Sequence, residues 1–121
     1  MAKHAKFVVA LHPEDARLIL QEVLTAARYR YSWEHQQRGL AEKGSKTKAA
    51  LLGVFSMYYP YSLQIDLNGD DTVTVSLFQA STGMMGGAIG ITKVRKELDA
   101  LVTATRLAYE AKGVLRHLDI G

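Results

Sequence analysis

A glycine-rich loop carries the residue pattern most open to ligand chemistry in this chain of 121 residues. Between a strand-like segment and a long helical segment, glycine recurs as G-x-x-G-G-x-x-G over residues 83–90. Glycine lets main-chain amides come close to a ligand, and a helix start behind the loop supplies unpaired N–H donors. The spacing differs from the dinucleotide-binding pattern G-x-G-x-x-G, and no Gly-Lys-Ser or Gly-Lys-Thr closes a phosphate-binding loop. The loop therefore matches neither standard template, and an anion site here is a hypothesis that depends on the residues after the loop.

Three basic residues after the loop decide how this anion site is interpreted. If the helix starts near residue 91, Lys93, Arg95 and Lys96 lie in its first turn, where each positive charge opposes the helix dipole by about 0.3–1 kcal/mol. A bound anion would reverse that effect. If the helix begins near Gly87, the same residues lie on a solvated face in its middle and need no anion. The anion-binding candidates are Gly86, Gly87, Gly90, Thr92, Lys93 and Lys96.

Methionine and tyrosine side chains form a second candidate set. Thioethers and phenol rings adapt to apolar partners of varied shape, although such residues more commonly belong to a core and its rim. If Met84 and Met85 are exposed in the loop, they form an adhesive surface for a protein or a small lipid. The apolar-contact candidates are Met57, Tyr58, Tyr59, Tyr61, Met84 and Met85.

The sequence gives little support for a catalytic site or for a metal or cofactor site. The chain has no cysteine, which removes disulfides, thiol nucleophiles and the common structural zinc sites. Its four histidines are not paired at the i, i+4 spacing of a helical metal site, and no Gly-x-Ser-x-Gly elbow is present. The acidic pairs Glu14-Asp15 and Asp70-Asp71 are typical of a helix start and a turn. We expect no catalysis, no metal and no cofactor.

Charge is distributed unevenly along the chain. Residues 28–48 contain six Lys or Arg against two Glu, a net charge of +4, whereas residues 49–92 contain three Asp and no Lys or Arg. A basic segment of this kind can attract phosphates, but it is more commonly a solvated edge. Because the aromatic residues are not clearly interleaved with the basic ones on a single strand pair, we do not expect nucleic acid as the partner.

The first third of the chain predicts one strand, one helix and a segment open to two interpretations. Apolar residues alternate over 6–11, and Pro13 followed by two carboxylates is a strong helix start. Helical spacing then continues to about residue 27. Residues 29–37 alternate like a strand, which we favour, although a helix continuing to Gln37 with Gly39 as its cap is the alternative. Residues 39–45 could form a short strand.

A β-hairpin is the clearest element of the sequence. Polar and apolar residues alternate without error over 62–67 and 72–77. For the apolar residues of both strands to share a face, Leu67 must lie opposite Val73. A two-residue Asn-Gly turn would pair Ile65 with Thr72 on the wrong face, so a loop of three to five residues or a bulge is required.

The remaining helix and the overall pattern predict the fold class. Apolar residues from Val94 to Tyr109 predict a long last helix with a broad apolar face, capped at Lys112-Gly113. We expect a single α+β domain over residues 1–121, with 114–121 as a C-terminal tail. Its architecture would be a two-layer sandwich in the order β-α-β-β-β-α, with two helices on one face of an antiparallel sheet of about four strands. No segment reads as a signal peptide or membrane span, so a cytoplasmic location is expected.

The order of the predicted helices and strands resembles that of known protein domains, although the resemblance is one of pattern and not of motif. A KFVVAL strand, an HPEDA helix start, alternating strands, a glycine loop and a long last helix resemble small uncharacterised bacterial α+β domains. More loosely, the order is similar to the helix-grip fold of START and Bet v 1-like proteins. That resemblance implies an apolar ligand held between a curved sheet and the last helix. The chain departs from it in strand count, since residues 39–79 have room for only about three strands.

Three functional hypotheses follow from these observations. The first is a non-enzymatic interaction module that associates with itself through the apolar face of the last helix or an open sheet edge. The second is a carrier of a small apolar molecule or lipid. The third is an anion or nucleic-acid binder that uses the basic segment 28–48 with the glycine loop 83–90.

Overall fold

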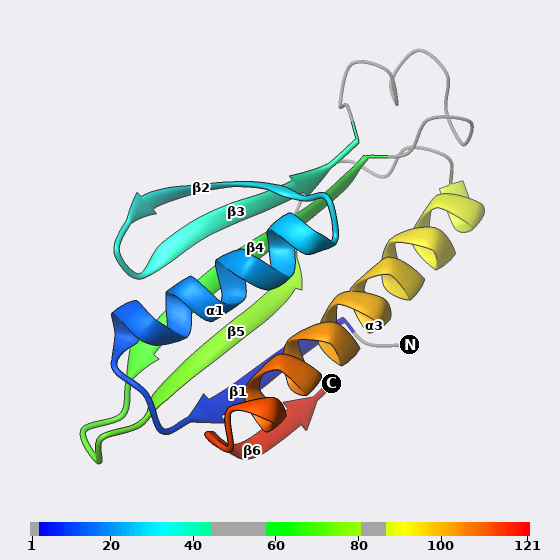
Figure 1. Cartoon of the computed structure of the whole chain (residues 1–121). Helices are drawn as coiled ribbons and strands as arrows, with labels where there is room; N and C mark the ends of the chain where they lie inside the picture. Colours follow the sequence, from blue (N-terminus) through cyan, green and yellow to red (C-terminus); the bar gives the residue numbers. More distant parts are fainter. Residues whose placement is uncertain (1–2, 45–57, 81–86) are drawn as a thin grey trace.

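The computed structural model describes residues 3–44, 58–80 and 87–121, without the side chains of 87–91. Its elements follow one another as β1 (His4–Val9), α1 (Pro13–Ala26), β2 (Arg30–His35), β3 (Arg38–Lys43), β4 (Tyr59–Leu67), β5 (Val73–Gln79), α3 (Gly87–Ala111) and β6 (Leu115–Ile120). All paired strands are antiparallel, in the spatial order β2-β3-β4-β5-β1-β6. Figure 1 shows α1 and α3 side by side on one face of this sheet.

This arrangement confirms the predicted α+β class, the antiparallel sheet and the two helices on one face, but the strand count was wrong. The sheet has six strands instead of about four. The described elements run β-α-β-β-β-β-α-β, which replaces the predicted order. One further strand is β6, which occupies the segment predicted to be a tail. Its apolar alternation is interrupted because the register with β1 shifts between Val8 and Val9.

The other uncertain segment, residues 29–37, is extended as favoured, and the helical alternative was wrong. The main chain takes a left-handed conformation at Arg28, with φ of 66°. There the amide of Tyr29 donates to the carbonyl oxygen of Leu24 at 2.8 Å, which closes the end of α1. Tyr31 then pairs with Ala41, so residues 30–43 form the β2–β3 hairpin. The short strand expected within 39–45 is thus β3.

The β4–β5 hairpin has the predicted register. Leu67 lies opposite Val73, Ile65 opposite Val75 and Leu63 opposite Leu77. The connection is the five-residue loop 68–72, in which Gly69 and Asp71 have positive φ values of 80° and 63°. The longer loop satisfies the requirement that the aliphatic residues of both strands reach the same face.

The core lies between the sheet and the helix layer. The ring of Phe7 on β1 meets that of Tyr109 on α3 at a centroid distance of 6.0 Å. The hydroxyl of Tyr109 donates to the carbonyl oxygen of Ala16 on α1 at 2.7 Å, which joins the two helices. α3 ends at Ala111, and Gly113 behind it has a positive φ of 69°, at the predicted cap. Within the described part of the chain, neither helix combines the length and the apolar character that crossing a bilayer requires.

Candidate functional site

The glycine loop falls largely beyond the part of the chain that the structure describes. Met57, Met84, Met85 and Gly86 lie outside the described residues, so their roles stay predictions. Gly87 begins α3, which places Lys93 six residues, or about 9 Å, along the helix. The dipole of a helix acts mainly within its first turn. Of the two alternatives for the helix start, the one near Gly87 is confirmed, so Lys93 and Lys96 lie beyond the first turn and the charge anomaly that favoured an anion is removed.

The tyrosines of the apolar-contact set have separate environments. Tyr61 is fully buried, and its hydroxyl donates to the carbonyl oxygen of Val94 at 2.6 Å, so its ring belongs to the core. Tyr59 and Tyr58 are half-buried. The hydroxyl of Tyr58 donates to Glu42 Oε2, and burial together with that carboxylate raises the pKa of Tyr58 to about 12. Only Tyr58 and Tyr59 of this trio have surface to offer a partner.

Four side chains from the α1–β2 connection, β3, β4 and the first half of α3 meet, and we call them the tyrosine–glutamate cluster: Tyr29, Lys43, Tyr61 and Glu97. Glu97 Oε1 accepts hydrogen bonds from Lys43 Nζ at 2.7 Å and from the Tyr29 hydroxyl at 3.2 Å. The rings of Tyr29 and Tyr61 lie 5.9 Å apart, and the Lys43 ammonium sits 5.4 Å from the centre of the Tyr29 ring. The sequence spreads these residues over nearly 70 positions, so no local pattern marks them.

The electrostatics of the tyrosine–glutamate cluster suit a structural link between α3 and the sheet. Burial, followed by the charge of Glu97, raises the pKa of Tyr61 well above its ordinary range. Burial is also the largest cause of the raised pKa of Tyr29, with Tyr61 and Glu97 adding to it. Both phenols therefore stay protonated and act as hydrogen-bond donors. A protonated phenol with a raised pKa is a poor base or nucleophile, which argues against a catalytic role. The hydrogen bonds of the cluster instead hold α3 against the sheet.

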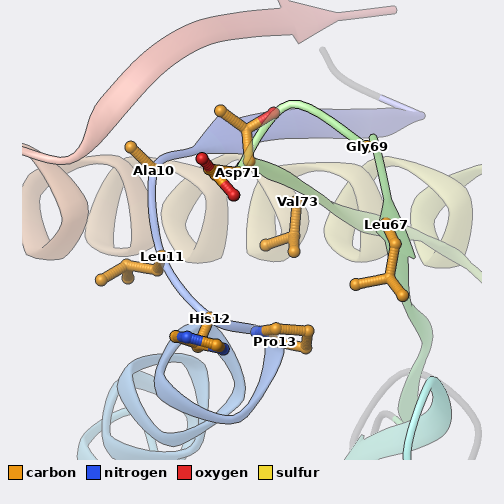
Figure 2. A pocket seen from close by; sticks show the side chains of 9 residues that line it. Ala10, Leu11, His12, Pro13, Leu67, Gly69, Asp71 and Val73 are labelled. Carbon is orange, nitrogen blue, oxygen red and sulfur yellow. The ribbon is translucent and has the colours of Figure 1, made fainter.

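A shallow hollow of about 470 Å³ lies where the β1–α1 turn approaches the β4–β5 hairpin (Figure 2). Leu67, which is 61% exposed, and Val73 give it an apolar floor, while His12 and Asp71 are its titratable lining residues. Figure 2 shows His12 and Asp71 on different segments that border the hollow. Across the described residues there is no group of three or more His, Asp or Glu that could hold a metal ion.

Two basic residues in the described part of the basic segment have identified neighbours. Lys43 is paired with Glu97, and Arg30 donates to the carbonyl oxygen of Gly44 at 2.5 Å. On the sheet, Arg30 lies opposite Glu42 in the β2–β3 register. Arg30 and Lys43 therefore each have an acidic neighbour.

The face of the sheet away from the helices is uncovered by any described element. Phe78 on β5, 36% exposed, lies between Ser62 and His4 on the neighbouring strands. A hollow of about 190 Å³ opens beside it, lined partly by Arg38 and Gln64. By register, Leu40 and Val8 share this face with Phe78 and with polar residues such as Ser62.

The outer edge of β6 is the feature that the sequence interpretation missed. β6 borders the sheet beyond β1, and no described strand pairs with its other side (Figure 1). Leu118 and Ile120 alternate with Asp119, which is the weak signal that could have marked a strand. Ile120 is 52% exposed although it is a large aliphatic residue.

Comparison with known proteins adds no relative. No protein-family model and no curated protein matches this chain. Its function must therefore be inferred from the surfaces and contacts described above.

Proposed function

We propose that this protein is a non-enzymatic interaction module that associates with itself. The observation that carries the proposal is the open edge of β6, where an extended strand offers main-chain donors and acceptors without a described partner. Such an edge is a template for another strand unless it is blocked. Each of two identical chains provides a β6 edge, so pairing the two edges satisfies the main-chain donors and acceptors of both chains.

The hydrogen bonds at the end of β6 show which of its groups face outward. The amide of Gly121 donates to the carbonyl oxygen of His4 at 3.1 Å, and the amide of His4 donates back at 3.4 Å. In an antiparallel pair, residues that exchange both bonds alternate with residues whose amides and carbonyls point away. Leu118 and Ile120 therefore direct their main-chain groups toward the open side.

Exposed aliphatic residues on β6 and α3 support association. Ile120 on β6 and Leu107 on α3 are 52% and 53% exposed. Ala104 and Ala111 lie one turn before and after Leu107 on the same exposed side of α3. Covering aliphatic surface of this kind stabilises association by about 25 cal/mol per Å² of area removed from water, before the cost of ordering is subtracted.

The other two hypotheses have less support from the described residues. For a carrier, the inner face of α3 is occupied: Tyr109 and Leu98 of α3 are buried in the core, and Tyr61 of β4 bonds to the main chain of α3. For an anion binder, Lys93 lies well inside the helix and Lys43 is neutralised by Glu97.

Sedimentation equilibrium over a wide range of protein concentrations tests the proposal. We expect the average mass to rise from that of one chain, 13.4 kDa, toward twice that value. A mass that stays at one chain at every concentration contradicts self-association. Native mass spectrometry of the purified protein and salt-dependent retention on heparin test the carrier and anion alternatives in the same preparation.

A further inference from the structure

We infer that two chains pair through β6 about a two-fold axis at Leu118, with His117 of each chain opposite Asp119 of the other. This inference rests on the proposed self-association and names its interface. The occupant of the open edge is a second copy of this chain, and the sheets of both copies join into one continuous antiparallel sheet.

The backbone limits the registers that such a pair can adopt. Because Leu118 and Ile120 point their main-chain groups outward, hydrogen-bonded pairs across the new junction must be made from these positions. A two-fold axis at Leu118 lets its amide and carbonyl bond to those of Leu118 in the other copy. His117 and Asp119 of opposite copies then form the pairs without main-chain hydrogen bonds, in which the side chains approach most closely.

The side chains of this register lie on suitable faces. In the register with β1, Leu118 lies opposite the buried Phe7 and shares its face toward the helices. Asp119 and His117 lie opposite Lys6 and Val8, on the uncovered face of the sheet. The junction therefore has leucine against leucine on the helix side and acid against imidazole on the other side.

Charge complementarity selects this register over its neighbours. Shifting the axis to residue 119 would place Asp119 directly opposite its own copy, and shifting it to residue 117 would oppose two histidines. Two carboxylates directly opposite one another destabilise a strand pair, whereas an imidazole N–H opposite a carboxylate can donate a hydrogen bond to it. In the proposed register Asp119 lies between Lys6 of its own chain and His117 of the other copy, while Arg116 is held by the carbonyl oxygen of Gly113 at 3.0 Å.

A pair of charge variants tests the interface by exchange of partners. His117→Asp places two acids opposite each other in its own homodimer, and Asp119→Lys places lysine opposite histidine. We expect each variant alone to associate roughly tenfold or more weakly than the wild type. In an equimolar mixture, both junction pairs combine an acid with a base, so a heterodimer of near wild-type affinity should form and be seen by native mass spectrometry.

Matched controls separate this interface from other surfaces and from misfolding. His35→Asp makes the same change on β2, at the opposite edge of the sheet, and Asp70→Lys makes the second change at the exposed hairpin loop. Both should leave the dissociation constant unchanged. The new lysine in Asp119→Lys also lies opposite Lys6 of its own chain, where two positive charges oppose folding. Circular dichroism of every variant therefore checks that it is folded. Ile120→Pro provides a second route, since it removes an outward amide without touching the bonds to β1.

The outcomes distinguish the interface from the proposed function. Weak homodimers that recover on mixing, together with loss of association in Ile120→Pro, support the β6 interface. If the wild type associates but folded His117→Asp and Ile120→Pro do so equally well, the interface is wrong while self-association stands. A wild type that remains a single chain at every concentration overturns both.

Discussion

The hydroxyl of Tyr109 on α3 donates a hydrogen bond of 2.7 Å to the main-chain carbonyl oxygen of Ala16 on α1, across 93 positions of sequence. The same ring packs against Phe7 of β1. One side chain thereby fixes both helices to each other and to the strand next to β6. The position of the helix layer over the sheet depends on this contact.

Removing the Tyr109 hydroxyl should loosen that contact without opening a large cavity. We expect Tyr109→Phe to lower the free energy of unfolding by about 1 kcal/mol, the usual net value of a buried hydrogen bond. Urea denaturation measures the change. Tyr31→Phe, on the exposed β2 strand, serves as the control and should shift stability by less than about 0.5 kcal/mol. Equal effects at both positions would contradict the structural role assigned to Tyr109.

Glu97 and Glu110 both lie on α3 but differ in what they join. Glu97 links α3 to Lys43 and Tyr29, whereas Glu110 pairs with Arg106 one turn away at 3.2 Å. We expect Glu97→Gln to cost about 1 kcal/mol, because a charged acceptor shared by two donors is weakened. Glu110→Gln should cost less than about 0.5 kcal/mol, as for exposed helical ion pairs. Thermal unfolding at low and high salt would compare them, and no difference between the two variants would count against the tyrosine–glutamate cluster.

Buried tyrosines should make stability fall at alkaline pH. Burial holds the pKa of Tyr61 and Tyr109 in the folded protein above the ordinary value of 10.0. Above pH 10 the unfolded chain releases these protons while the folded chain retains them. The contribution is therefore complete below pH 10 and is lost as pH rises, at about 1.4 kcal/mol per pH unit for each buried tyrosine. Urea midpoints measured from pH 8 upward should decline less steeply in Tyr109→Phe, and identical slopes would refute the assignment.

Gly39 lies against the single tryptophan, which gives an optical readout. A Cβ atom at Gly39 would come within 2.7 Å of both the carbonyl oxygen of Ser32 and the ring atom Cε3 of Trp33. We expect Gly39→Ala to displace the indole, whose N–H donates to Gln21 at 2.8 Å, and to change its fluorescence. Gly69→Ala is the control, since its φ of 80° makes the change strained but no atom lies within 4 Å. The control should cost about 1 kcal/mol or more with unchanged emission.

The sequence by itself determined the elements whose signals are local. The alternation from Leu63 to Leu77 specified both strands of the β4–β5 hairpin and even its register, because each side chain must choose one of two faces. Pro13 and the helical spacing behind it specified α1, and Gly113 marked the end of α3. Each of these signals depends on a few neighbouring residues, which is why a single sequence contained it.

Only the tertiary structure decided what depends on distant partners. Residues 115–120 become a strand because β1 offers them an edge, and a shift of register hides their alternation. Glu97 meets Tyr29 and Lys43 only after the helix has packed on the sheet. That β2 and β6 form the two edges of the sheet is likewise a property of strand order. Hydrogen bonding between strands and burial of charge are set by residues far away along the chain, so local pattern could not contain them.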